Sequence, residues 1–287
     1  MKKLLERIGN VDRRVIFVLM ALAVIVPLAL KLTMEMPVGE GPSYELYEYI
    51  DQLPADSRVL MSFDYDPSTK PELQPMARAL VAHMLGSDLN IVAMALWPQG
   101  ATLGQEILSG VSDSLGAEQY EDWVNMGYKT GGQVLIVRLG TSIEAAFPTD
   151  LENVPYGEIP MLSDVSTLRD FDLVVTLSAG DPGIPAWVMI ASDRFGVPVG
   201  GGCTAVSAPQ FYPYLQQRDG ERPQMEGLLG GLRGAADYET LIERPGLAAA
   251  GMSAQSIAHL VIMVFIVIGN ITFFATGRKK RTKGGGR

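Results

Sequence analysis

The sequence predicts an α/β fold, in which a mostly parallel sheet of about five strands is covered by helices on both faces. Three observations support this prediction. Short apolar runs bounded by turn residues alternate with segments of helical periodicity between residues 58 and 245. Proline and glycine stand where such helices would begin and end. The chain has 287 residues, of which 47% are apolar and 19% charged, enough for one large domain or two small ones.

The predicted elements follow from these runs in order. Strands are expected over residues 58–65, 89–97, 122–126, 172–178 and 197–207. Helices are expected over residues 71–86, 102–115, 182–191, 211–217 and 225–243. Segment 133–147 is ambiguous, because its β-branched residues favour a strand, whereas its length and the preceding strand favour a crossover helix, which is the preferred interpretation. Right-handed crossovers would make this a Rossmann-like three-layer sandwich.

Charge and composition exclude several classes of protein. One cysteine excludes an internal disulfide framework, and one cysteine with two histidines argues against a zinc site. The net charge is −9, but residues 32–255 hold thirty acidic side chains against eleven basic ones. So acidic a region would repel phosphate backbones, which excludes nucleic acid as a partner.

Two apolar segments predict a membrane protein. Residues 15–34 and 256–276 are each long enough to span a bilayer, which takes about 17–25 helical residues. A basic N-terminus (1–14) precedes the first segment and a basic tail (277–287) follows the second, so both termini are expected to be cytoplasmic. The first segment reads as an uncleaved signal anchor, because no small-x-small cleavage site follows it.

This topology places an α/β domain (58–245) between two linkers (35–57 and 246–255) on the extracytoplasmic side, in a bacterial cell on the outer face of the inner membrane. The first linker is expected to hold a short amphipathic helix. Within the second apolar segment, Asn270 is expected either to contact the first span or another chain, or to be solvated near the headgroups.

A pair of carboxylates follows the first predicted strand, in the run Asp64-Tyr65-Asp66. The stretch VLMSFDYD resembles the start of haloacid-dehalogenase-type phosphotransferases. The resemblance implies a carboxylate that attacks phosphorus, a second that shuttles a proton, and Mg²⁺ as cofactor. The sequence departs from that pattern with Pro67-Ser68-Thr69 after the second aspartate, and no acidic pair follows a later strand. The alternative is a solvated turn in which Asp66 caps the next helix.

Ligands of parallel α/β sheets bind outside the carboxyl ends of the strands. The candidate ligand-binding residues there are Tyr65, Asn125, Ser178, Gly200, Gly201, Gly202 and Cys203. Glycines at 200–202 would let a backbone approach a ligand, or simply permit tight packing, which is the preferred interpretation. Cys203 would need a histidine base to act as a nucleophile, and a small buried thiol is the preferred interpretation.

No complete catalytic or metal-binding constellation emerges, so we expect no enzyme activity, cofactor or metal. The expected role is a non-enzymatic binding, scaffolding or assembly module of a membrane complex, with the lipid bilayer and other membrane proteins or further copies of the chain as partners. Two alternatives remain: a membrane-anchored, magnesium-dependent hydrolase using Asp64 and Asp66, and a small-ligand sensor or transport accessory.

Overall fold

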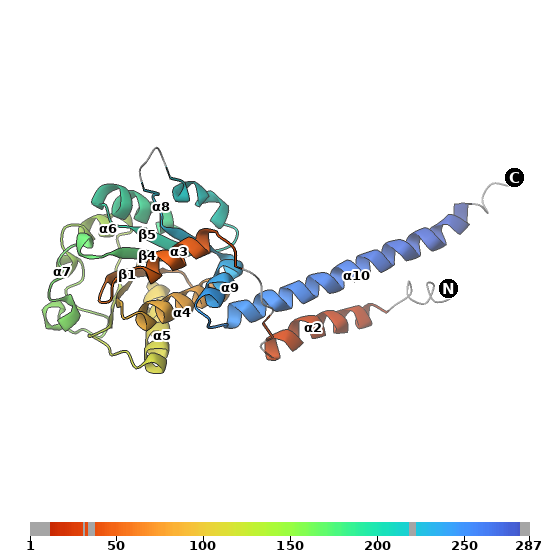
Figure 1. Ribbon diagram of the computed structural model, residues 1–287, viewed down its shortest axis with the longest axis horizontal. Coiled ribbons are helices and arrows are strands. Elements are labelled where there is room, and N and C mark those ends of the chain that lie inside the picture. The colour runs from red at the N-terminus through yellow and green to blue at the C-terminus, as the bar shows by residue number, and fades with distance from the viewer. Residues whose placement is uncertain (1–11, 31, 34–37, 218–221, 282–287) are drawn as a thin grey trace. The chain divides into compact units, whose positions relative to one another are not determined.

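Six parallel strands form the sheet at the centre of the domain (Figure 1). They are β1 (Arg58–Asp64), β2 (Asn90–Ala95), β3 (Trp123–Tyr128), β4 (Leu173–Ser178), β5 (Val199–Cys203) and β6 (Gly227–Gly230). Their order is β3-β2-β1-β4-β5-β6, so the winding direction reverses between β1 and β4. This confirms the prediction of a mostly parallel, Rossmann-like α/β sheet, with six strands where about five were expected.

The computed structural model describes residues 12–30, 32–33, 38–217 and 222–281. They fall into two units. Glu35–Ala249 forms the α/β domain, and the other unit comprises Met1–Met34 and Ala250–Arg287. Of the two predicted basic termini, residues 1–11 and 282–287 lie outside the described residues.

Helices cover both faces of the sheet. Helices α3 (Pro42–Asp51), α4 (Lys70–Gly86), α5 (Pro98–Leu115) and α9 (Gly231–Leu241) pack on one face. Helices α6 (Gln133–Leu139), α7 (Ile143–Ala146), α8 (Gly183–Trp187) and the π-helix Val188–Arg194 lie on the other. Side chains of β1 point alternately to the two faces of the sheet and pack against both helix layers. Phe63 packs under Gly104 of α5, whereas Leu60 joins a core cluster with residues of α6 and α8. The 3₁₀ turns are Tyr156–Glu158, Pro160–Leu162, Leu168–Asp170, Ala208–Gln210 and Tyr212–Leu215.

Three predicted helices differ from the structure. Segment 225–243 begins as strand β6 and turns into α9 at Gly231, whose φ of +58° suits glycine. Segment 133–147 is helical as preferred, but as the two short helices α6 and α7, and Gly140 after α6 lies against the Phe195 ring, where a side chain would collide. Segment 211–217 holds a 3₁₀ turn.

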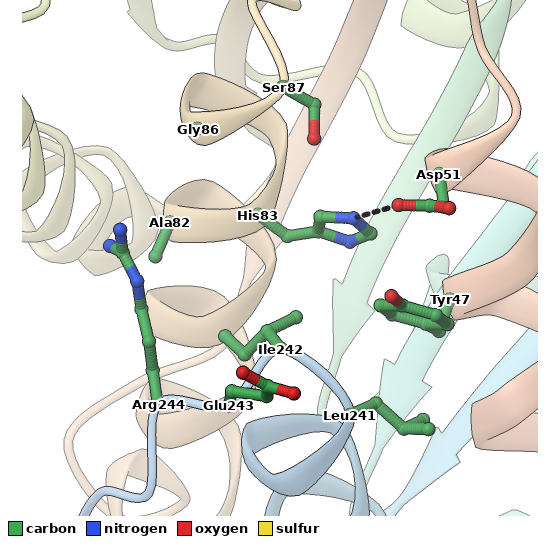
Figure 2. A pocket seen from close by; sticks show the side chains of 10 residues that line it. All are labelled: Tyr47, Asp51, Ala82, His83, Gly86, Ser87, Leu241, Ile242, Glu243 and Arg244. Carbon is green, nitrogen blue, oxygen red and sulfur yellow. Dashed lines mark ion pairs between the residues drawn. The ribbon is translucent and has the colours of Figure 1, made fainter.

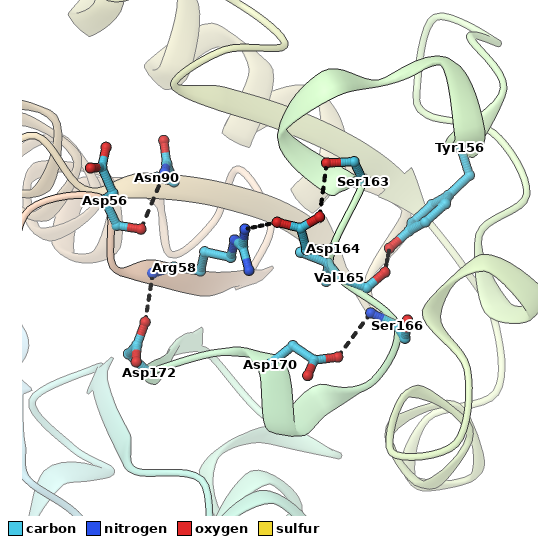
Figure 3. A network of polar contacts seen from close by, with 10 residues as sticks. All are labelled: Asp56, Arg58, Asn90, Tyr156, Ser163, Asp164, Val165, Ser166, Asp170 and Asp172. Carbon is cyan, nitrogen blue, oxygen red and sulfur yellow. Dashed lines mark hydrogen bonds and ion pairs between the residues drawn. The ribbon is translucent and has the colours of Figure 1, made fainter.

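A polar network fixes the amino-terminal edge of the sheet (Figure 3). The backbone N–H of Arg58 donates to Asp172 Oδ2 at 2.8 Å, and its guanidinium reaches Asp164 Oδ2 at 3.4 Å. Asp170 Oδ2 accepts from Ser166 N at 2.9 Å within the same connection. The segment before β4 is therefore attached to the start of β1, beside which β4 then pairs.

The second unit contains α2 (Arg13–Ala29) and most of α10 (Leu247–Arg281). Among the described residues only α10 is long and apolar enough to cross a membrane, over the 28 residues Leu247–Phe274, in which an 18-residue stretch has a mean hydropathy of 2.4. Of the two predicted spans, only the second is therefore supported by the described residues, because α2 comprises 17 residues, Arg13–Ala29, with Pro27 inside it. The helix α10 also begins at Leu247, within the predicted linker 246–255.

A buried carboxylate defines where α10 begins. Glu239 of α9 accepts hydrogen bonds from Gly246 N at 2.9 Å, Ala248 N at 3.2 Å and Ala249 N at 2.8 Å. Amide groups in the first turn of a helix lack partners inside the helix, and a carboxylate there also interacts favourably with the positive end of the helix dipole. Burial raises the pKa of Glu239, against the effect of these three donors.

We expect Gly227→Ala to destabilise the domain, because the added Cβ would collide with the backbone of Leu46 in α3. Overpacking of this kind costs about 1–3 kcal/mol. The matched control is Gly110→Ala in α5, where open space surrounds the site and the substitution should stabilise the helix by about 0.5–1 kcal/mol. Chemical denaturation of both variants measures the difference, and equal effects would contradict the packing of α3 on β6.

Candidate functional site

The candidate site lies where the winding direction of the sheet reverses, between the carboxyl ends of β1 and β4. Asp64 ends β1 and Ser178 ends β4, and the two residues are direct neighbours in the parallel register. Crevices at such switch points are the usual ligand sites of open α/β sheets. The strand pairing thus places Asp64 and Ser178, both expected at the carboxyl ends of strands, side by side at this edge.

The carboxylate of Asp64 is fully buried and faces donors of the protein itself. Oδ1 accepts from the backbone N–H of Leu96 at 2.7 Å, just beyond β2. Oδ2 accepts from Ser62 Oγ at 2.8 Å and lies 3.5 Å from Nε1 of Trp187 in α8. These contacts join β1, the end of β2 and the helix layer on one face of the sheet.

Burial dominates the acidity of this group. It raises the pKa of Asp64 to about 6, although hydrogen bonds from Leu96, Ser62 and Trp187 favour the charged form. With both oxygens engaged and no solvent access, the carboxylate is not oriented toward a bound substrate. A nucleophile or metal ligand needs a free lone pair directed at its target.

The second carboxylate of the pair lies in a different environment. Asp66 is outside the sheet and accepts from Ser68 N at 2.9 Å and from Ser68 Oγ at 2.6 Å, which forms an Asx turn before α4. These hydrogen bonds lower the pKa of Asp66. Tyr65 between them is buried, and its hydroxyl has no hydrogen-bond partner among the described residues. The geometry thus resembles the solvated-turn interpretation more than a shared catalytic pair.

Two tryptophans close this edge, and the sequence reasoning missed both. Trp97, between β2 and α5, donates from Nε1 to the carbonyl of Asp181 at 2.8 Å and lies against Gly180 in the loop after β4. Trp187 contacts Asp64 from α8. Trp187 is fully buried, so its indole is part of the packing around Asp64. Neither position follows from local sequence, because each tryptophan meets a partner distant in the chain.

Two predicted polar residues have structural partners. Asn125 in β3 donates from Nδ2 to the Ala101 carbonyl at 3.0 Å and to Gln105 Oε1 at 3.1 Å, both in α5. Ser178 donates to the Gly180 carbonyl at 2.8 Å and so supports the loop beneath Trp97. Both side chains are buried. They hold neighbouring segments in place rather than project into open space.

The three glycines of β5 accommodate neighbouring side chains. A Cβ at Gly200 would collide with Leu46 of α3, and one at Gly202 would lie 2.8 Å from Sδ of Met76 in α4. A Cβ at Gly201, on the opposite face, would lie 2.8 Å from the Thr176 carbonyl oxygen. The glycines therefore provide close packing of both helix layers, as the preferred interpretation holds.

The remaining candidates are separate from this edge or inert. Cys203 is fully buried, and burial, with Glu72 nearby, raises the pKa of its thiol to about 12, which disfavours a thiolate. Asn270 is exposed on α10, and no described residue hydrogen-bonds to its side chain. Within the described ranges, no group of three or more His, Cys, Asp or Glu side chains could hold a metal ion.

No protein-family model and no curated protein matches this sequence. Among solved structures, the C-terminal domain of a glycosyl transferase group 1 family protein (LpcC) from Francisella tularensis is 15% identical, with 78% of this chain and 93% of that one covered and a TM-score of 0.29. The C-domain with NADP of a bacterial malonyl-CoA reductase is 13% identical, covers 79% and 35% and has a TM-score of 0.25. Similarities this low carry no inference about function.

The raised pKa of Asp64 predicts an unusual pH dependence of stability. The folded domain binds the proton more tightly than the unfolded chain does, so the contribution of Asp64 to the free energy of unfolding is largest at low pH. It should decrease by on the order of 3 kcal/mol as the pH rises from below 4 to above 6. Denaturation of wild type and Asp64→Asn across this range isolates the effect.

Asp66→Asn is the matched control for this measurement. The pKa of Asp66 is lowered in the folded chain, so its contribution to stability is lost as the pH falls, which is the opposite sign. We expect the free energy of unfolding of wild type, minus that of Asp64→Asn, to decrease as the pH rises. An increase of this quantity with pH would contradict the buried position of the carboxyl.

Proposed function

We propose that this chain is a membrane-anchored protein whose α/β domain is a non-enzymatic binding or assembly module of a membrane complex. The observation that carries the proposal is the closed switch point, where Asp64 is engaged by Leu96, Ser62 and Trp187. A domain whose carboxylate at the switch point is buried and bound by the chain's own donors is suited to present a surface rather than to transform a substrate.

The membrane part of the proposal is supported by α10. Its span Leu247–Phe274 follows directly from the domain, and many of its apolar side chains are exposed in this chain. Basic residues follow the span at 278–283 and others precede α2. We propose that α2 also enters the bilayer, that both termini are cytoplasmic, and that the acidic domain lies on the opposite side.

The assembly role and the alternative hydrolase role are distinguished by two measurements on the same purified proteins. The full chain is extracted from its native membranes in mild detergent and measured by native mass spectrometry, where we expect a complex of defined stoichiometry with other membrane proteins or further copies. Asp64→Asn and Asp66→Asn should retain this complex. A monomer under every mild condition would contradict the assembly role.

The same preparations are tested with p-nitrophenyl phosphate and Mg²⁺. We expect no turnover above that of Asp64→Asn, because the buried carboxylate cannot reach a phosphorus atom. Glu121→Gln, an exposed change of equal charge in the β3 region, is the control. Magnesium-dependent hydrolysis that Asp64→Asn abolishes and Glu121→Gln retains would favour the hydrolase instead.

The topology is tested by cysteine labelling of intact cells with a membrane-impermeant maleimide. The native Cys203 is buried and should give little background. We expect Glu121→Cys in the domain to be labelled from outside, and Thr282→Cys in the basic tail to be labelled only after the membrane is permeabilised. The reverse pattern, or labelling of both from outside, would refute the proposed orientation.

A further inference from the structure

A polar cavity of about 280 Å³ lies far from the switch point, among α3, the C-terminal end of α4 and the segment after α9 (Figure 2). Helix α4 leads from the carboxyl end of β1 to the start of β2, so its C-terminal end is at the amino-terminal edge of the sheet. The cavity is therefore independent of the residues around Asp64.

His83 forms the central wall of this cavity. Its Nδ1 is 2.8 Å from the hydroxyl of Tyr238 in α9, and its Nε2 is 3.6 Å from Asp51 Oδ1 in α3. Burial lowers the pKa of His83, against the opposite effect of Asp51, so the ring is neutral at neutral pH. A neutral ring accepts the Tyr238 hydroxyl at Nδ1 and leaves the charge of Asp51 uncompensated.

An aromatic face and a second carboxylate complete the lining. The Tyr47 ring stacks on His83 with centroids 4.9 Å apart. Asp51 and Glu243 line the same cavity as Tyr47, and burial, together with their charges, raises the pKa of that phenol. Among the described residues, Glu243 forms no ion pair.

The basic residue of the lining does not neutralise these charges. Figure 2 shows the Arg244 side chain running along the outer side of Ala82, away from His83 and Asp51. Two carboxylates, an aromatic ring and the Ser87 hydroxyl therefore line a water-accessible space, with Arg244 on its Ala82 side. Carboxylates beside an aromatic face are the groups that bind ammonium and guanidinium ions in proteins.

We propose that this cavity binds an organic cation of the amine or guanidinium class, held between Asp51 and Glu243 and against Tyr47. The excess of acidic residues in the domain would favour the approach of such a ligand. This site goes beyond the proposed assembly role and does not depend on it. The cation could belong to a small free amine or guanidine or to a basic side chain of another protein, because both carry the same charged group.

The test uses the full chain in detergent micelles with ¹³C-labelled histidine, which gives two imidazole signals because the chain has two histidines. Propylammonium chloride and propylguanidinium chloride are the probes, and sodium chloride at equal ionic strength is the reference. We expect the His83 signal to shift saturably with one or both probes. The bound cation should also lower the pKa of His83, because it disfavours a protonated ring nearby. The His259 signal should not respond.

Glu243→Gln should weaken probe binding about fivefold, as expected for the loss of one partly exposed ion pair. Glu121→Gln removes the same charge elsewhere on the domain and should leave binding unchanged. The proposal is overturned if sodium chloride produces the same shift, if His259 responds in parallel, or if Glu243→Gln binds as wild type does. Failure of these tests would leave the oligomeric state of the extracted protein, and hence the assembly role, unaffected.

Discussion

The buried carboxylate of Asp64 is the interaction on which the central part of the domain depends. It lies at the point where the two halves of the sheet diverge, and its three donors come from β1, the chain after β2 and α8. A buried carboxylate without donors would be strongly destabilising, so these segments must be in register for the domain to fold. The same contacts that satisfy the charge hold both carboxylate oxygens toward the chain's own donors.

The fold could be predicted from the sequence where local signals and tertiary packing agree. The runs at β1, β2 and β4 are apolar and bounded by turn residues, and α4 begins beside a proline. Strand β6 could not be predicted, because Gly227–Gly230 contains two glycines and two leucines, and only pairing with β5 makes it extended. Hydropathy alone placed the first apolar segment at residues 15–34, whereas α2 covers Arg13–Ala29, because apolar character does not define where a helix begins and ends.

The candidate sites were less predictable than the fold. Sequence placed Asp64 at a strand end, but its burial depends on Trp187, which is 123 residues away. It placed His83 on a helix, yet the partner Tyr238 lies 155 residues further along the chain. A sequence does not show whether glycines in a strand allow close packing or allow a ligand to approach. At β5 the close packing is shown only by the positions of Leu46 and Met76. Chemistry assembled from distant segments has no local signature.

The cap on α10 has a consequence for how the chain is made. Glu239 lies on α9, which packs on α4, and from there it accepts from Gly246, Ala248 and Ala249. The first turn of the long apolar helix therefore has its hydrogen-bond partner in the α/β domain, on the helix that precedes it in the chain. In a nascent chain whose α9 has not yet formed, the first-turn amides of α10 would lack this partner and the start of the helix would fray. Formation of the end of the α/β domain therefore stabilises the start of the apolar helix.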